Sequence, residues 1–482
     1  MRPLIDQSLN QFLLDALAFL EYTNEFVFQG VNPGGHYTAI WCRDAAHILN
    51  DWFVSGGSIT KIIEQIAFIW SHQIEPGKEK LIYGRGSPDM NFQISTANKD
   101  IEKEFEGALP TTIYSHYNFS EVYGKSPDID STALMVSTTS FILYSLLKQE
   151  KTLSTAHRYS GAKSEPYKQK EVIDHLVPRM LSAVNYLIKR DIDDDCLLEQ
   201  SYNEDWMDTV LRAGKIVYSQ ATWVLALKNF SAFIFELDNK KAEAKRTLKA
   251  ARKSIDAIDQ KLWSQRKNCY VDLIQKENHG DFEYGIITQD VLIFLLAVSE
   301  NKYLKKNSKN HENDEINMND YGEESNCVSS DNGSDNSIPE TNIHNKSSLH
   351  QRSIETLDAV RKIWKGGWPL VTESLLAKTG PAILNPNEYH NYTCWPWMTA
   401  IEMLTRSRYD RFEKQDLIFI SELISKDNGY GYAFYEWIDP STETGHGAFP
   451  FRTGISCMRL ALREIITGSE MHRDSGCAIT AD

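Results

Sequence analysis

Residues 9–20 read Leu-Asn-Gln-Phe-Leu-Leu-Asp-Ala-Leu-Ala-Phe-Leu, and the apolar side chains in this stretch recur every three or four positions. The stripe consists of Leu9, Phe12, Leu13, Ala16, Leu17 and Leu20. This spacing places the side chains on one face of an α-helix. Similar stripes follow along the chain, whereas the alternation typical of half-buried strands is rare. Because an apolar helix face has to be covered by another element, the pattern predicts a large core made of helices.

Stripes of this kind predict about twelve helices along the chain. They are expected near residues 6–24, 41–55, 59–74, 130–148, 170–189, 217–236, 239–262, 286–300, 352–365, 394–407, 413–426 and 452–467. Twelve helices can form six antiparallel pairs that close into an (α/α)6 toroid with a pocket at one end. An open helical solenoid produces a similar pattern, but no repeated sequence motif favours it. We therefore expect an all-α toroid that forms a single domain of residues 1–482.

Two connections between the expected helices are long. Residues 75–129 carry Gly, Pro and several aromatic residues, which suits an ordered excursion over the pocket. Residues 305–351 are dominated by Asn, Ser, Asp and Glu and contain few large apolar residues. Such a segment cannot bury enough apolar surface to offset the entropy of ordering. We expect residues 305–351 to be a disordered insertion within the domain that the chemistry does not need.

Charge and apolar pattern narrow the class of partner. The formal net charge is −15 and no basic cluster stands out, which argues against nucleic acid because that binding depends on Lys and Arg at phosphates. Residues 1–30 lack the apolar centre of a signal peptide, and no window approaches the roughly 18 apolar residues of a membrane-spanning helix. The seven cysteines show no spacing that would suggest a zinc site. We expect a cytoplasmic protein with reduced thiols that does not act on a membrane.

Four patches of sequence concentrate Trp, Tyr, His and carboxylates in turns and at helix ends. They are residues 36–44, residues 127–134, residues 202–208, and a split patch made of residues 389–397 and 431–440. A rigid scaffold presents functional groups at such places. Sugar sites need this mixture, because aromatic faces stack on a pyranose while Asp, Arg and His hydrogen bond to its hydroxyls.

Each patch also has a purely structural interpretation. Asp44 could cap a helix beside an Arg43 surface pair, and Asp130 and Ser131 are natural capping residues. Residues 202–208 could form a solvated acidic loop. The aromatic residues of the fourth patch could simply pack in the core.

Two features favour a catalytic role of these patches over a purely structural one. Three carboxylates crowd around Trp206, and such crowding can raise the pKa of one of them, as a general acid requires near neutral pH. Glu436 lies between Tyr435 and Trp437. A carboxylate buried there would need a partner, which core packing alone does not supply.

Together the patches resemble the (α/α)6 glycosidases, the six-hairpin glycosidase barrels. These include the glucosidase domain of glycogen debranching enzymes, the mannosylglycerate hydrolase-like group and, more distantly, glucoamylases and plant neutral invertases. The likeness runs in the same order over about residues 36–460. A Trp-x-Arg-Asp element of those families lines the sugar pocket, and Trp41, Arg43 and Asp44 match it. Their Trp-Met-Asp element carries the general acid, which falls on Asp208 here.

The remaining patches look like further elements of the same families. Their Tyr-His-Asn-x-Thr-x-Trp-Pro-Trp element corresponds to residues 389–397, with Tyr392 where debranching enzymes usually have Gly, so that the pocket is expected to be narrower. Asp130 resembles an acidic pocket residue of another shared element. The element that carries the catalytic base in the mannosylglycerate hydrolase-like group is similar to Phe434, Glu436, Pro440 and Gly445. Glu443 makes the spacing before the glycine one residue longer.

The resemblance implies an inverting glycoside hydrolase with Asp208 as general acid and Glu436 as general base, their carboxyl groups lying roughly 6.5–9.5 Å apart. The implied substrate is an α-linked glucoside, as for an α-glucosidase or amylo-α-1,6-glucosidase, or a related small glycoside or oligosaccharide. No cofactor and no metal is required. The residues implied to bind the sugar are Trp41, Arg43, Asp44, Asp130, Trp206, His390, Trp395 and Trp437.

Two other functions compete with hydrolysis. A sugar epimerase on the same barrel would use a histidine pair to move a proton at carbon. Of the histidines in the patches, His36, His390 and His446, none has the acid and base setting of the two carboxylates. A carbohydrate-binding protein without turnover would keep the pocket but would not need both Asp208 and Glu436. The sequence indicates neither the linkage nor the oligomeric state.

Overall fold

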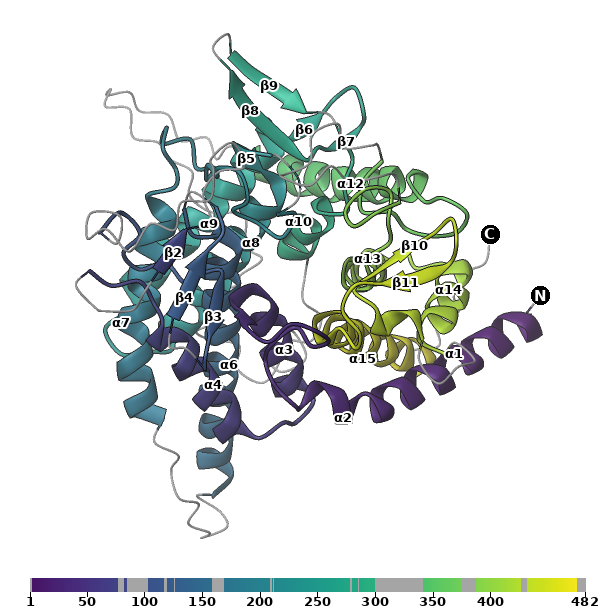
Figure 1. Ribbon diagram of the computed structural model, residues 1–482, viewed down its shortest axis with the longest axis horizontal. Helices are drawn as coiled ribbons and strands as arrows, with labels where there is room; N and C mark the ends of the chain where they lie inside the picture. Colours follow the sequence, from purple (N-terminus) through teal and green to yellow (C-terminus); the bar gives the residue numbers. More distant parts are fainter. Residues whose placement is uncertain are drawn as a thin grey trace.

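Helices make up most of the computed structural model (Figure 1). It describes residues 2–76, 82–84, 103–116, 119–124, 126–157, 169–208, 210, 212–277, 280–284, 286–299, 341–373, 387–425 and 431–474. The helices are α1 (Arg2–Tyr22), α2 (Asn24–Val27), α3 (Cys42–Val54), α4 (Ile59–Ser71), α6 (Ile129–His157), α7 (Gln169–Ile188), α8 (Val217–Phe235), α9 (Lys241–Lys261), α10 (Val291–Val298), α12 (Thr341–Lys362), α13 (Pro396–Arg408), α14 (Lys414–Ile424) and α15 (Arg452–Asp474). The predicted all-α class is confirmed.

The strands are short and lie between helices. They are β1 (Ile40–Trp41), β2 (Ile82–Gly84), β3 (Thr112–Tyr114), β4 (Phe119–Val122), β5 (Lys215–Ile216), β6 (Trp263–Ser264), β7 (Cys269–Tyr270), β8 (Leu273–Glu277), β9 (Gly280–Tyr284), β10 (Trp437–Asp439) and β11 (Thr444–His446). They form sheets of order β1-β3-β4-β2 and β5-β8-β9 and two hairpins, β6-β7 and β10-β11. The 3-10 helix η1 (Tyr432–Phe434) precedes β10. Strands therefore serve as connections and do not form a layer of their own.

Six helices contact one another in a closed cycle. In chain order α3 contacts α6, α6 contacts α8, α8 contacts α10, α10 contacts α13, α13 contacts α15, and α15 returns to α3. Most of the other long helices pack behind a member of this cycle: α4 on α3, α7 on α6, α9 on α8 and α12 on α10. Figure 1 shows the cycle around the middle of the molecule, with α1 along one edge beside α14 and α15.

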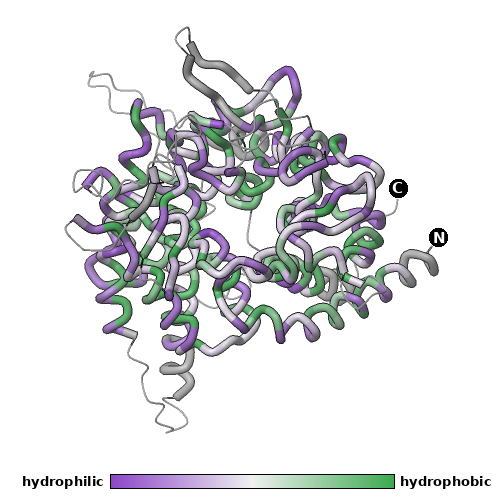
Figure 2. The backbone as a smooth tube through the Cα atoms, in the orientation of Figure 1, coloured by the Kyte–Doolittle hydropathy of each residue, from purple (hydrophilic) through white to green (hydrophobic). Residues whose placement is uncertain are grey.

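Apolar content differs between helix α10 of the cycle and helix α9, which packs behind the cycle. Helix α10 reads Val-Leu-Ile-Phe-Leu-Leu-Ala-Val and is buried almost all round, as expected for a helix covered on every side. Helix α9 instead buries one stripe that includes Leu248, Ile255 and Ile258, and the rest of it is polar. Figure 2 shows this mixture as alternating hydrophobic and hydrophilic stretches along individual helices. No helix among the described residues is both long and apolar enough to cross a bilayer.

Helix α12 departs from the sequence-based boundaries. It begins at Thr341 and not near residue 352, so the last part of the segment 305–351, expected to be disordered, is helical. Within this additional part of the helix, Leu349 packs against the core. Residues 305–340 lie outside the described part of the chain. The described parts of residues 75–129 form β2, β3 and β4.

A buried ion pair joins the first helix of the cycle to the last. Arg459 on α15 donates from Nε to Asp51 Oδ2 on α3 at 2.8 Å. Its Nη1 donates both to the Leu20 carbonyl at 2.6 Å and to Thr23 Oγ1 at 2.7 Å, at the end of α1. Neither Arg459 nor Asp51 is exposed. The guanidinium therefore holds three chain segments together at the point where the cycle closes.

Arg459→Met should destabilise the fold strongly. The substitution leaves the Asp51 carboxylate buried without its counter-charge, which costs about 3–5 kcal/mol. Lys240→Met is the control, because the Lys240–Glu243 pair is partly exposed and such a pair contributes only about 0–1 kcal/mol. The midpoint of urea denaturation should fall much further for Arg459→Met. Equal shifts in both variants would show that the buried pair does not hold the cycle closed.

Candidate active site

A cavity of about 180 Å³ opens where the first turns of several cycle helices meet. Seven residues predicted from the sequence line it: Trp41, Arg43, Asp44, Trp206, Asp208, Trp395 and Glu436. The cavity is also lined by Pro33, Tyr37, His47, Tyr123, Tyr389, Trp397, Phe451 and Thr453. Arg43 and Asp44 lie in the first turn of α3, Trp397 in that of α13 and Thr453 in that of α15. The fold thus gathers residues of three of the four sequence patches, far apart in the chain, at one end of the helical cycle, and none of residues 127–134 lines the cavity.

Glu436 is held on both carboxylate oxygens. Its Oε1 accepts hydrogen bonds from the Tyr37 hydroxyl at 2.8 Å and from the Tyr389 hydroxyl at 3.3 Å. Its Oε2 accepts one from the Ala448 backbone N–H at 2.8 Å. Burial raises the pKa of Glu436, and the hydrogen bonds from Ala448 and Tyr37 offset part of that rise. The partner that a buried carboxylate requires is therefore present.

Asp208 also lines the cavity, and its charge acts on the two tyrosines that hold Glu436. Burial raises the pKa of Tyr37, and the negative charges of Glu436 and Asp208 raise it further. Burial likewise raises the pKa of Tyr389, and the negative charges of Asp208 and Glu436 raise it further. Both hydroxyls consequently keep their protons at neutral pH and remain hydrogen-bond donors. Two carboxylates thus share the surroundings of one pair of tyrosines.

Arg43 is the cation of the cavity wall, and carboxylates position it. Its Nη1 lies 3.2 Å from Asp130 Oδ2 in the first turn of α6, and its Nε lies 3.6 Å from Asp44 Oδ2. Asp44 Oδ1 accepts a hydrogen bond from Thr453 Oγ1 at 2.6 Å. Asp130 is fully buried and does not line the cavity. It therefore acts on a ligand only through Arg43.

The turn that carries Asp208 is anchored by a buried cluster of charges. Trp206 Nε1 donates to Asp290 Oδ1 at 2.8 Å. Arg212 follows in the chain, and its nitrogens lie 2.9 Å from Asp205 Oδ2, 2.8 Å from Asp272 Oδ1 and 2.7 Å from Asp290 Oδ2. Burial raises the pKa of Asp290 to about 7 even though Arg212 opposes the rise. Trp206 before Asp208 and Arg212 after it are therefore tied to the same aspartate, Asp290.

Indole rings form one wall of the cavity. The Trp206 ring meets Trp395 and Trp397 edge to face, with centroids 5.4 Å and 4.8 Å away. His390 stacks on Trp395 at 4.9 Å and also meets Trp206 edge to face. His390 is completely buried, and it does not line the cavity. It supports the indole wall from behind instead of contacting the cavity as predicted.

Trp437 also lies outside the cavity lining. It begins strand β10 and stacks on His446, its antiparallel partner on β11, with ring centroids 4.4 Å apart. Its ring lies 6.4 Å from that of Tyr389, which does line the cavity. Glu436 precedes β10 and is held by Tyr37, Tyr389 and the Ala448 N–H, whereas the Trp437 ring packs on its cross-strand neighbour.

Several lining residues were not among the predicted site residues. Tyr37 and Tyr389 fall inside the quoted patches, but nothing in their spacing tells that both reach Glu436. Thr453 and Tyr123 have no local signal, because their place in the wall follows from tertiary packing. Tyr37 and Glu436 are far apart in the sequence, so no local pattern predicts the hydrogen bond between them.

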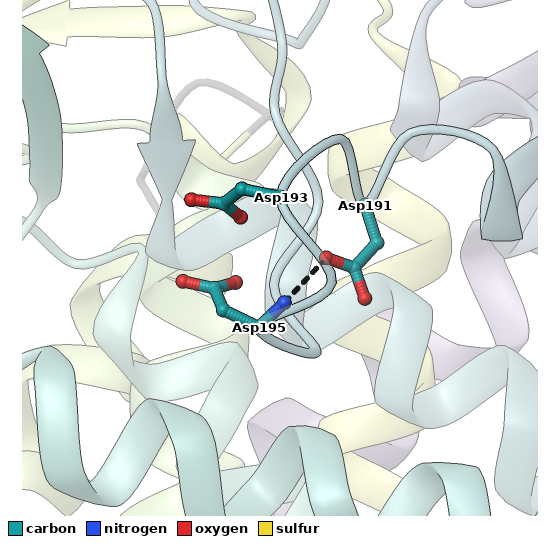
Figure 3. Close-up of side chains that lie close together, drawn as sticks. All are labelled: Asp191, Asp193 and Asp195. Atoms are coloured by element: carbon teal, nitrogen blue, oxygen red, sulfur yellow. Dashed lines mark hydrogen bonds between the residues drawn. The ribbon is translucent and has the colours of Figure 1, made fainter.

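A second group of carboxylates lies apart from the cavity. Figure 3 shows Asp191, Asp193 and Asp195 on one loop, with the Asp195 backbone N–H donating to Asp191 Oδ1 at 2.9 Å. One ligand oxygen from each lies within 4.8 Å of the others. Oxygen ligands of this kind suit a hard cation, but Lys215 Nζ lies 3.0 Å from Asp193 Oδ2 and also contacts Asp195, as does Lys261. Lysines thus already supply positive charge to this loop.

Comparison with known proteins identifies the fold. No family model matches the chain, and no curated protein sequence matches it significantly. An uncharacterized conserved protein from Thermus thermophilus matches in structure with a TM-score of 0.52 and 12% identity, over 91% of this chain and 98% of that one. The GH63 mannosylglycerate hydrolase of the same organism, solved in complex with glucose, matches with a TM-score of 0.51 and 13% identity, over 93% and 98%.

A rhamnosidase from Klebsiella oxytoca with rhamnose bound matches with a TM-score of 0.50 and 11% identity, over 98% of this chain and 64% of that one. At identities this low the similarity is one of fold. The chain therefore shares the fold of these glycoside hydrolases.

Gly447 should be indispensable to the position of Glu436. Its φ of +76° disfavours any side chain, and a Cβ there would lie 2.4 Å from Glu436 Oε2. Gly56 has the same φ of +76° with nothing within 4 Å of an added Cβ, so it is a matched control. Alanine at either position should cost about 1–2 kcal/mol of backbone strain.

Gly447→Ala should cost a further 1–3 kcal/mol or so from overpacking. The difference between the two urea-denaturation midpoints measures this second contribution. Equal destabilisation of the two variants would mean that Glu436 is not held against Gly447.

Proposed function

We propose that the protein is an inverting glycoside hydrolase whose catalytic domain is an (α/α)6 toroid, with the closed cycle of helices as its inner ring. The observation that carries the proposal is the shared cavity of Asp208 and Glu436, in which Glu436 is held by Tyr37, Tyr389 and the Ala448 N–H. The similarity of fold to glycoside hydrolases supports it. A buried, oriented carboxylate opposite a second carboxyl group is what hydrolysis with inversion requires.

In the proposed mechanism Asp208 is the general acid. It donates its proton to the glycosidic oxygen as the bond from that oxygen to the anomeric carbon breaks. Glu436 is the general base and takes a proton from a water molecule, whose oxygen attacks the anomeric carbon from the opposite face. The sugar leaves with the opposite anomeric configuration, and the aglycone leaves as an alcohol. The hydrogen bonds to Glu436 leave it oriented toward that water.

The cavity supports a small glycone. Its volume of about 180 Å³ is below the roughly 300–1,000 Å³ of pockets that take drug-sized ligands, which favours one sugar unit removed from a chain end or a small glycoside. Arg43 and Asp44 would bind hydroxyls, and Trp41, Trp206 and Trp395 would cover the apolar faces of the ring. An α-linked glucoside fits this proposal, and the glucose held by the mannosylglycerate hydrolase is in keeping with it.

The histidines do not favour the epimerase alternative. His390 is buried behind Trp395, and His446 lies on the exposed side of the β10–β11 hairpin. His36 packs against Tyr37 with the rings tilted and their centroids 4.3 Å apart. None of these three lines the cavity, and His47 is a single histidine among its lining residues, whereas the epimerase hypothesis requires a pair of histidines that move a proton at one carbon of a bound sugar.

Asp208→Asn and Glu436→Gln should each reduce hydrolysis at least about 100-fold, because each removes a general acid or base. Release of free sugar from malto- and isomalto-oligosaccharides, trehalose and glucosylglycerate measures the loss. Asp191→Asn is the control, since it changes a carboxylate remote from the cavity. Turnover by either cavity variant at the wild-type rate would refute the assigned roles.

Tyr37→Phe should move the acidic limb of the pH–activity profile to higher pH. Glu436 must be ionised to act as a base, and burial already raises its pKa, so activity falls as the pH drops through that raised pKa. The Tyr37 hydrogen bond opposes the rise, and its removal raises the pKa further. Tyr435→Phe is the control, because the Tyr435 ring packs against Phe449. An unchanged limb in Tyr37→Phe, or an equal shift in the control, would contradict this assignment.

A further inference from the structure

His47 is a cavity residue that the proposed mechanism does not use. It lies on α3, and it shares one face of that helix with Arg43 and Asp44, which precede it by four and three positions. All three line the cavity. The ring of His47 also lies beside Trp397, with centroids 5.7 Å apart. Its position is thus fixed by a helix on one side and an indole on the other.

The imidazole of His47 has unused hydrogen-bonding capacity. Its Nε2 is shielded from solvent and makes no hydrogen bond within the part of the chain that the structure describes. A buried polar atom without a partner costs free energy, and such atoms in folded proteins generally have a partner or a role in function. A ligand hydroxyl in the cavity is the kind of group that would satisfy the ring.

The ring is also suited to a neutral ligand. Burial lowers the pKa of His47 to about 4, and the positive charge of Arg43 contributes to this shift. At neutral pH the imidazole is therefore uncharged, with one nitrogen as a donor and the other as an acceptor. Asp208 and Glu436 instead act on the pKa values of Tyr37 and Tyr389. His47 lies one turn further along α3 than Arg43, whereas Asp208 and Glu436 lie on connecting segments outside the helices. It therefore meets the cavity from α3 and not from the segments that hold the two catalytic carboxyl groups.

We propose that His47 determines sugar specificity by hydrogen bonding a hydroxyl on the edge of the pyranose remote from the anomeric carbon. The inference rests on the proposed use of the cavity as a sugar site. It adds to that site a residue that recognises one hydroxyl of the sugar. The anomeric carbon has to face Asp208 and Glu436, so the 2-hydroxyl beside it lies nearer to them. The hydroxyl that meets His47 is then one at C3, C4 or C6.

The test is equilibrium binding of monosaccharides followed by NMR titration. D-Glucose, D-mannose and D-galactose are offered to the wild-type protein, followed by the 2-, 3-, 4- and 6-deoxy forms of the sugar that binds best. His47→Leu should bind the parent sugar about 3- to 10-fold more weakly, the effect of one lost neutral hydrogen bond. For one deoxy form, other than the 2-deoxy form, His47→Leu and the wild type should bind with equal affinity. His47→Gln, which keeps a polar group, should recover part of the affinity.

Asn50→Leu is the matched control. Asn50 follows on α3, its Oδ1 also makes no hydrogen bond to a described residue, and it does not line the cavity. This variant should bind like the wild type. The proposal would be overturned if both leucine variants lost the same affinity for the parent sugar, or if His47→Leu lost the same affinity for every deoxy form. It would also be overturned if none of the three sugars bound to the wild type. Sugar binding that depends on His47 without any hydrolysis would instead contradict the proposed function and leave this inference standing.

Discussion

The contact between α3 and α15 is the constraint on which the rest of the structure depends. These two helices begin far apart in sequence, and their packing closes the cycle. Two polar links run along the interface: Thr453 to Asp44 at the cavity end, and Arg459 to Asp51 about two turns deeper. The first positions a cavity carboxylate and the second ties the closure to α1. The interaction that completes the fold therefore also completes the wall of the site.

Closure explains why the site can be assembled from short segments. Each cycle helix brings its first turn to the same end, so Asp44, Asp130 and Thr453 come together although no two of them are neighbours in the chain. A carboxylate in the first turn of a helix is favoured by the helix dipole, which suits Asp44 and Asp130. Arg43 then finds both carboxylates within reach. Asp44 and Asp130 therefore have the sequence pattern of helix caps and also contribute to the cavity, because the first turns of the cycle helices surround it.

The sequence was sufficient for the helices and only partly sufficient for the site. Period-3.6 stripes such as residues 9–20 depend on local spacing alone, and they predicted the described long helices to within a few residues at most ends. The start of α12 was placed too late, because the polar composition before residue 352 did not indicate that this stretch is helical or that Leu349 packs against the core. His390 and Trp437 lie outside the cavity, since aromatic content does not tell which way a ring faces. The partnership of Tyr37 with Glu436 depends on tertiary packing and has no local signature.

We propose that Asp208 and Glu436 hydrolyse a glycosidic bond with inversion. Proton NMR of the first sugar released from an α-linked glucoside by the wild-type protein tests this proposal. Inversion should release the β-anomer first, and the α-anomer should follow only by mutarotation. Initial release of the α-anomer would contradict it, because retention requires a covalent intermediate and a closer pair of carboxyl groups.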